Sequence, residues 1–217
     1  MIYIVGVGPG SKEYLTYKAT TIVNSGDLIV GSKRLLNMFD NNENKEKLIL
    51  TVNLRNELNN LFNNENSKYY YKNYKNIVIL SSGDPCFSGL LKTVLKYTDK
   101  NNIEVISGIS SIQIACAKLK ISWEDYIILT IHGKEENKEK LLNLVKNNEK
   151  IIFLPNNVKK DLEYLINNGI DGNKKIWICE NLTYNSEKII YDSINNILNN
   201  IKNNNYKISY CVVCVIN

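Results

Sequence analysis

Short apolar runs alternate along the chain with segments whose apolar residues recur at helical spacing. In the first half, the apolar runs are residues 2–5, 28–30, 48–50, 77–80 and 103–106. The segments with helical spacing are residues 15–23, 54–62, 90–97 and 112–119. Runs of this length are typical of buried strands, and the spacing is typical of helices that cover a sheet. The first half is therefore predicted to be an α/β domain.

The same alternation begins again after residue 122. Apolar runs lie at residues 127–131, 151–154, 176–179, 188–191 and 210–216, and helical spacing at residues 141–145, 158–166 and 194–201. Parallel neighbouring strands need a crossover connection, and the runs at 188–191 and 210–216 do not have one to each of their neighbours. The second sheet is therefore predicted to be mixed. We expect two α/β domains of similar size, residues 1–120 and residues 121–217, with a trough between them.

Composition narrows the class of protein. The 217 residues are 44% hydrophobic, enough for a substantial core, and no stretch approaches the roughly 20 apolar residues of a membrane span. No signal peptide precedes the first strand, and the five cysteines, an odd number, indicate a reducing compartment rather than a disulfide framework. We therefore expect a cytoplasmic protein. Cys211 and Cys214 would point to opposite faces of a strand, so they are interpreted as core residues rather than a metal or redox pair.

The net charge of +5 is spread through segments rich in lysine and asparagine. Nucleic-acid binders usually concentrate basic residues on one face, often as arginine, whereas this chain has only Arg34 and Arg55. Four tyrosines within residues 59–76 would suit base stacking, but we favour tyrosines that lie against the body of the domain. No nucleic-acid partner is expected.

Two glycine-bearing segments directly follow predicted strands. Residues 6–10 read Gly-Val-Gly-Pro-Gly, and residues 81–89 read Ser-Ser-Gly-Asp-Pro-Cys-Phe-Ser-Gly. Glycine lets a ligand approach the backbone closely, and strand ends in an open α/β sheet commonly converge on one ligand. These segments predict a small-molecule site at the carboxyl ends of the strands.

The first of these loops matches neither common nucleotide motif. A dinucleotide fingerprint requires glycine at its sixth position, which here is Ser11, and an acidic residue after the second strand, which here ends in Gly31-Ser32. No Gly-Lys-Ser or Gly-Lys-Thr follows either loop, so a P-loop is absent as well. Binding of a nicotinamide dinucleotide and hydrolysis of a nucleotide are both disfavoured.

Three segments together resemble one known family, the tetrapyrrole methylases. Residues 5–10 read Val-Gly-Val-Gly-Pro-Gly, residues 83–85 read Gly-Asp-Pro and residues 108–111 read Gly-Ile-Ser-Ser, in the order and spacing of that family. The resemblance extends over essentially the whole chain. The segments most similar to the members that methylate C5 of cobalt-precorrin-7 are residues 31–36, 80–91, 131–133 and 180–182. The chain departs from the usual pattern at Ser11, Cys86 and Ser88.

The resemblance implies a two-domain fold that binds S-adenosylmethionine in a cleft between the domains, usually as a homodimer. It implies methylation of a ring carbon of a carboxylate-rich corrin precursor during cobalamin synthesis. Its cofactor contacts map onto Pro9, Ser82, Gly83, Asp84, Phe87, Ser110, Ser111, Leu154 and Leu182. Because two domains account for the whole length, a separate C15-methylating decarboxylase is implied as a pathway partner.

Methyl transfer from a sulfonium to an electron-rich carbon depends on alignment and exclusion of water more than on a protein nucleophile. Asp84 is interpreted as a hydrogen-bond acceptor for the cofactor or a balance for its charge, with a loop-capping role as the alternative. His132 is a candidate general base, but a hydrogen-bonded structural histidine is the favoured interpretation. Lys33 and Arg34 are candidates for attracting substrate carboxylates, against a solvated helix start. No protein-held metal is expected, since cobalt would arrive inside the substrate.

Two alternatives stay open at this point. The first is another member of the same fold that methylates a different tetrapyrrole carbon, RNA or a protein side chain. The second is a non-catalytic module that binds a ligand. Turnover of S-adenosylmethionine with a tetrapyrrole separates an enzyme from such a module.

Overall fold

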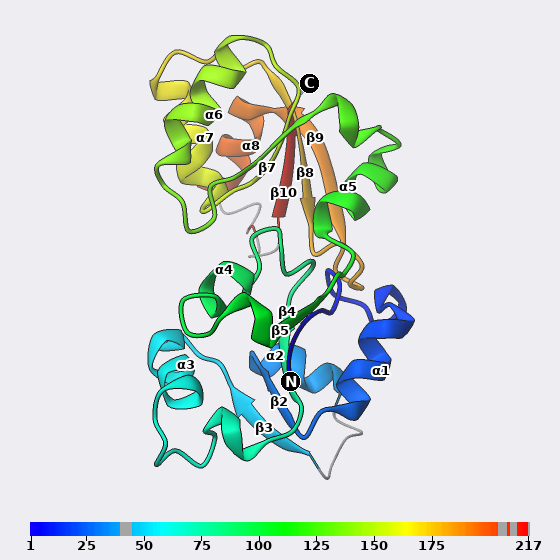
Figure 1. Ribbon diagram of the computed structural model, residues 1–217. Coiled ribbons are helices and arrows are strands. Elements are labelled where there is room, and N and C mark those ends of the chain that lie inside the picture. Colours follow the sequence, from blue (N-terminus) through cyan, green and yellow to red (C-terminus); the bar gives the residue numbers. More distant parts are fainter. Residues whose placement is uncertain (40–44, 204–207, 209–211, 217) are drawn as a thin grey trace. The chain divides into compact units, whose positions relative to one another are not determined.

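The computed structural model describes residues 1–39, 45–203, 208 and 212–216. Their contacts divide the chain into two compact units, Met1–Ser110 and Ser111–Asn217 (Figure 1). Each unit is an α/β structure with its own sheet and its own apolar core. The predicted fold class, two sheets flanked by helices, is therefore confirmed.

The first unit is built on a sheet of five parallel strands in the order β3-β2-β4-β1-β5. These strands are β1 (Ile2–Gly6), β2 (Leu28–Gly31), β3 (Glu46–Ile49), β4 (Ile77–Ser81) and β5 (Ile103–Ile106). The three central strands are buried along almost their whole length, as expected for a parallel sheet covered on both faces. All five carboxyl ends consequently lie at one edge.

Helices cover both faces of this sheet. On one face, α1 (Tyr17–Ser25) and α2 (Lys33–Leu36) pack against a core that includes Val5 and Leu80. On the other face, α3 (Leu54–Phe62) and α4 (Leu91–Val94) pack against a core that includes Ile4 and Ile79. The helix predicted at residues 90–97 is therefore a single α-helical turn. Short 3-10 turns complete the chain at Lys12–Tyr14, Asn37–Phe39, Tyr71–Asn73, Lys100–Asn102 and Trp123–Asp125.

The strand order creates a topological switch point between β1 and β4. From β1 the chain passes to β2 on one side of the sheet, whereas from β4 it passes to β5 on the other side. The connections that leave these two neighbouring strands therefore separate over opposite faces. In open α/β sheets, ligands bind in the crevice that such a separation leaves at the carboxyl ends.

The second unit is built on a mixed sheet in the order β6-β7-β10-β8-β9, as predicted. Only β6 and β7 run parallel as neighbours, and the other neighbouring pairs are antiparallel. The strands are β6 (Ile127–Thr130), β7 (Ile151–Leu154), β8 (Lys175–Glu180), β9 (Lys188–Ser193) and β10 (Val212–Ile216). On one face lie α6 (Asn137–Lys146), α7 (Val158–Asn167) and α8 (Ile194–Lys202).

Helix α5 (Ser111–Leu119) lies on the other face of this second sheet and contacts β10 (Figure 1). The sequence-based boundary after residue 120 placed this helix with the first domain. Its contacts place it with the second unit, where its Lys118 forms an ion pair with Glu187 at 2.8 Å. The division between the units thus falls directly before α5.

The tyrosines of the low-complexity segment lie against the first unit. Tyr70 is buried, Tyr69, Tyr71 and Tyr74 pack on the core, and the ring of Tyr71 lies 5.8 Å from that of Phe62. This arrangement confirms the structural interpretation of these tyrosines. Of the cysteines, Cys116, Cys179 and Cys214 are buried free thiols and Cys86 is exposed. The fifth cysteine, Cys211, lies outside the described residues.

Candidate functional site

The two glycine loops of the first unit meet directly. Gly8 and Gly83 form an isolated antiparallel bridge, in which the Gly83 amide donates to the Gly8 carbonyl at 2.8 Å. The Val7 amide also donates to the Ser81 carbonyl at 3.0 Å. Both bridging glycines have positive φ, +79° at Gly8 and +64° at Gly83, a conformation that glycine adopts without a steric cost. The predicted convergence of these loops is therefore confirmed.

A third loop, which follows β5, closes against the first two. A Cβ added to Gly6 would lie 2.5 Å from the Gly108 amide nitrogen, and one added to Gly108 would lie 2.3 Å from the Gly83 carbonyl oxygen. Gly83 itself is different, because a Cβ there would meet only the Cα of Ser110, at 3.6 Å. One side of the Gly83 backbone is thus open, whereas the neighbouring Gly6 and Gly108 are tightly packed.

Asp84 connects two of these loops through its carboxylate. Its Oδ1 accepts a hydrogen bond from the Cys86 amide at 2.8 Å, and its Oδ2 accepts one from the Gly108 amide at 3.1 Å. The first bond is the loop-capping interaction that we considered as an alternative, and the second reaches the loop after β5. Asp84 therefore fixes the position of its own loop relative to its neighbour.

The remainder of the β4 loop is shaped by backbone contacts. The buried Ser81 hydroxyl accepts from the Leu90 amide at 3.2 Å, and the Phe87 amide donates to the Asp84 carbonyl at 3.3 Å. Gly89 is packed against the backbone of Pro85, where a Cβ would lie 2.7 Å from its Cα. Burial, followed by the charge of Asp84, raises the pKa of the Cys86 thiol, which disfavours a nucleophilic thiolate at this position.

Arg34 joins this loop from the neighbouring strand. It lies in α2, directly after β2, and its Nη2 donates to the Ser82 hydroxyl at 3.1 Å. Ser82 and Arg34 are exposed, as is Lys33, for which no hydrogen bond or ion pair is present among the described residues. The structure thus brings a predicted substrate residue, Arg34, together with a predicted cofactor residue, Ser82.

The other predicted cofactor residues divide between the two units. Pro9 is buried in the first loop, and Ser110 lies beside Gly83. Ser111 begins α5 and is the first residue of the second unit. Leu154 ends β7, and Leu182, which is buried, follows β8. Because β7 and β8 both run antiparallel to β10, these two leucines lie at the same edge of the second sheet.

Thr130, a residue that the sequence analysis did not identify, belongs to this edge. It ends β6 opposite Leu154, and its buried Oγ1 has no hydrogen-bond partner among the described residues. A buried hydroxyl is normally paired, so an unpaired one beside predicted cofactor residues is a candidate ligand group. The signal in the sequence was a single hydroxyl residue near the end of the apolar run 127–131.

His132 lies nearby but differs from the expectation of a bonded structural histidine. Its amide donates to the Leu154 carbonyl at 3.2 Å, and its side chain is exposed, with no hydrogen bond to the imidazole among the described residues. In the described part of the chain, no group of histidine, cysteine, aspartate and glutamate side chains is arranged to hold a metal ion. No described helix is long and apolar enough to span a membrane.

Known proteins match this chain over nearly its whole length. The family model of the tetrapyrrole (corrin/porphyrin) methylases matches residues 1–197. A probable cobalt-precorrin-7 C(5)-methyltransferase of Methanocaldococcus jannaschii is 61% identical over 216 residues, which cover 99% of this chain and 97% of that relative.

Two solved structures share the fold. The cobalamin biosynthesis precorrin-6Y methylase of Archaeoglobus fulgidus matches with a TM-score of 0.68 and 23% identity, covering 100% of this chain and 97% of that one. A uroporphyrin-III C-methyl transferase of Thermus thermophilus, complexed with S-adenyl homocysteine, matches with a TM-score of 0.69 and 14% identity, covering 99% and 91%.

Proposed function

This chain belongs to the tetrapyrrole methylases, and on that premise we propose that it transfers a methyl group from S-adenosylmethionine to C5 of cobalt-precorrin-7 in cobalamin synthesis. The observation that carries the proposal is the 61% identity to the Methanocaldococcus jannaschii relative, which extends over nearly the full length of both chains. The matched region covers the loops of the candidate site as well as the scaffold.

The residues present fit the cofactor. When bound, S-adenosylmethionine supplies an activated methyl group. The open side of Gly83 leaves backbone accessible on a rigid support, and Ser82, Asp84 and Phe87 belong to the same loop. In the second unit, the unpaired Thr130 hydroxyl offers a polar partner next to Leu154. We assign Pro9, Ser110, Ser111 and Leu182 to the same cofactor on the basis of the family resemblance.

The contribution of the protein is alignment. The Gly8–Gly83 bridge and the bonds of Asp84 fix the loops through contacts within the protein, so little ordering is left to occur on binding. Holding two reactants in register can supply effective molarities of about 10⁵ M or more. Cys86 carries a raised pKa and stays protonated, and the reaction needs no covalent intermediate on the protein.

Charged residues at the carboxyl edge of the first sheet are proposed to recognise the substrate. Corrin precursors carry several carboxylates, and Lys33 and Arg34 offer positive charge at the end of β2. His132 is exposed and is our candidate to accept the ring proton. Cobalt enters as part of the substrate. We further propose a cytoplasmic homodimer with reduced cysteines, whose product passes to a separate C15-methylating decarboxylase.

The test is turnover by the purified protein. With cobalt-precorrin-7 and S-adenosylmethionine, we expect one equivalent of S-adenosylhomocysteine per equivalent of corrin, and a corrin heavier by one methylene unit in the mass spectrum. Binding of S-adenosylhomocysteine without any turnover of a tetrapyrrole would instead indicate a ligand-binding module.

A further inference from the structure

Two loops leave the same edge of the second sheet, one after β6 and one after β7. These strands are parallel neighbours, and their last residues, Thr130 and Leu154, lie opposite each other. The amides of Ile131 and His132 both donate to the Leu154 carbonyl, at 2.8 and 3.2 Å. The chain then enters α6 after the first loop and α7 after the second. The positions of Thr130 and Leu154 therefore depend on how these two loops are held.

Asp161 is a buried carboxylate in the first turn of α7, with only 1% of its surface exposed. Its Oδ2 accepts hydrogen bonds from the amides of Asn156 and Asn157, at 2.8 and 2.9 Å, in the loop after β7. Its Oδ1 lies 3.1 Å from Lys138 Nζ and has no other partner among the described residues. A buried carboxylate is costly unless it is both paired and hydrogen-bonded, so these three contacts define its position.

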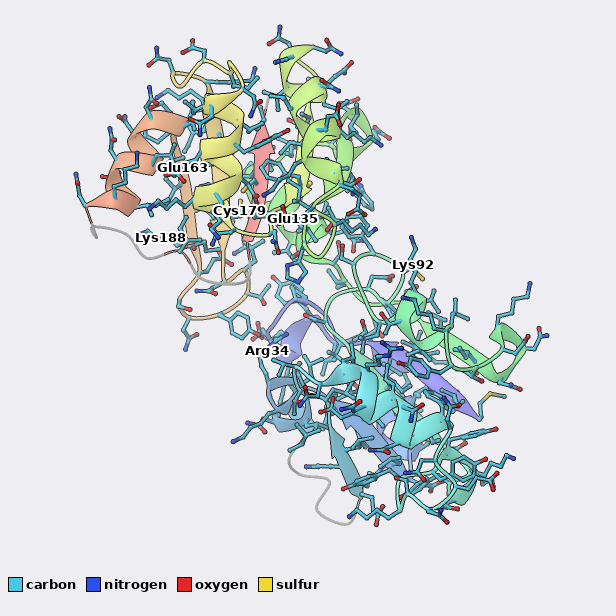
Figure 2. All side chains as sticks on the ribbon, turned by 90° about the vertical axis from the view of Figure 1, so that its left-hand side faces the viewer. Arg34, Lys92, Glu135, Glu163, Cys179 and Lys188 are labelled. Carbon is cyan, nitrogen blue, oxygen red and sulfur yellow. The ribbon has the colours of Figure 1, made fainter. Side chains whose placement is uncertain are left out.

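Lys138 reaches Asp161 from the other loop. It is the second residue of α6, and its side chain is 20% exposed. Its Nζ also lies 2.6 Å from Oε2 of Glu135, which is labelled in Figure 2, and Glu135 Oε1 accepts from Asn156 Nδ2 at 2.5 Å. The hydrogen bond to Glu135 raises the pKa of the Lys138 ammonium, against the opposing effect of burial, so the group is charged at neutral pH. These side chains join the loop after β6 to the loop after β7.

The joined loops also hold Thr130. Asn137, which precedes Lys138, donates from its Nδ2 to the Thr130 carbonyl at 2.8 Å. The Thr130 hydroxyl is buried and has no hydrogen-bond partner among the described residues. A hydrogen bond forms only within a range of about 0.5 Å, so a small shift of this edge would remove the hydroxyl from reach of a ligand. Holding the edge in place beforehand also lowers the cost of ordering on binding.

We propose that Lys138 and Asp161 are positioning residues for the S-adenosyl cofactor, because their ion pair holds the loops after β6 and β7 in the arrangement that presents Thr130 and Leu154. This role rests on the proposed function, which supplies the identity of the ligand. Neither Lys138 nor Asp161 is assigned a contact with the cofactor, and both act through the loops that they join.

The experiment measures two quantities for each variant: the Kd of S-adenosylhomocysteine by calorimetry, and the stability of the ligand-free protein in urea. Lys138→Met leaves the buried charge of Asp161 without its partner, so stability should fall and the Kd should rise by about tenfold or more. Lys138→Arg keeps the charge and should retain part of both.

A double variant separates positioning from stability. In Lys138→Met/Asp161→Asn both charges are replaced by neutral groups, so no buried charge is left unpaired and stability should largely recover. The loops are still no longer joined by the ion pair, so the Kd should stay raised by about tenfold or more. This variant also decides the matter if Lys138→Met does not fold.

Lys175→Met is the matched control. Lys175 Nζ lies 3.6 Å from Asp192 Oδ1, in a second lysine–aspartate pair of the same unit. Lys175 begins β8, which runs in the same direction as β7, so this pair lies at the opposite edge of the sheet. Loss of this pair should leave the Kd unchanged.

His132 gives a readout that needs no ligand. It is the only histidine of the chain and lies in the loop after β6, so its imidazole C–H signal is unique in a ¹H–¹³C spectrum. We expect this signal to shift or broaden in Lys138→Met and in the double variant, and to stay unchanged in Lys175→Met.

A double variant that binds S-adenosylhomocysteine as tightly as the wild-type protein would overturn the proposal, because the pair would then act on stability alone. An equal loss of affinity in Lys175→Met would overturn it too, as would absence of binding by the wild-type protein. Failure of the proposed function appears separately, as the expected pattern of affinities in a protein that does not methylate cobalt-precorrin-7.

Discussion

At the scale of single residues, the site depends on backbone more than on reactive side chains. Gly83 combines a positive φ with an open side, and Asp84 uses both carboxylate oxygens to hold amides of two loops. The glycines and the aspartate could be predicted from their place after apolar runs. The bond from Asp84 to Gly108 and the contact of Arg34 with Ser82 could not, because they join residues that are distant in sequence and meet only through strand order.

Gly83→Ala should weaken binding of S-adenosylhomocysteine by about tenfold or more, because a methyl group would fill the open side of the loop. Gly169→Ala is the matched control, since Gly169 also has positive φ, +92°, with open space around it. Both variants should lose a similar, small amount of stability from the strained backbone. Isothermal titration calorimetry measures the affinity. An equal effect of the two variants on affinity would contradict the assignment of the loop.

The reactivity of the Cys86 thiol reports the negative charge of Asp84. Burial and the neighbouring carboxylate raise the pKa of the thiol, so a smaller fraction is thiolate at pH 8 than for an ordinary cysteine. Asp84→Asn removes the negative charge and should lower this pKa, so alkylation of Cys86 by iodoacetamide at pH 8 should become faster. Peptide mass spectrometry follows the rate, with buried Cys116 and Cys179 as internal controls. A slower reaction in the variant would contradict the assigned electrostatic coupling.

At the scale of elements, the predicted site residues of each unit lie at strand ends or in the loops that follow them. Alternation of apolar runs and helical stripes predicted the central strands well, because strands such as β4 and β7 are buried by helices and therefore continuously or almost continuously apolar. The length of the helix predicted at residues 90–97 was overestimated, since only Leu91–Val94 is α-helical. The sequence also could not show which of the two sheets α5 packs against. Its apolar stripe fits either sheet, and only its contact with β10 places it in the second unit.

Thr130 tests the role of the β6 and β7 ends. Thr130→Val keeps the shape of the side chain and removes a buried hydroxyl that has no partner among the described residues. Without ligand, the variant should be more stable than the wild-type protein by about 1 kcal/mol, measured by urea unfolding. With S-adenosylhomocysteine, it should gain less stability than the wild-type protein, because the ligand loses a polar partner. Equal stabilisation of both proteins by the ligand would exclude Thr130 from the site.

At the scale of the whole molecule, the chain combines a parallel sheet and a mixed sheet in two units, each with a separate core. The glycine loops follow from the switch point between β1 and β4, which any similar strand order would create. The fold alone therefore does not determine which ring carbon is methylated. That choice rests on the 61% identity, over nearly the full length, to a relative named as a probable cobalt-precorrin-7 C(5)-methyltransferase, so the methylated carbon must be measured directly.

The most direct measurement is the position of the transferred methyl group. The protein is incubated with cobalt-precorrin-7 and S-adenosylmethionine labelled with ¹³C in its methyl group. The product is then purified without chelating agents and examined by NMR. The account predicts one labelled methyl group, bonded to C5 of the corrin ring, and loss of this product in Gly83→Ala at limiting cofactor. A label at another ring carbon, or an unlabelled corrin from a protein that binds the cofactor, would contradict it.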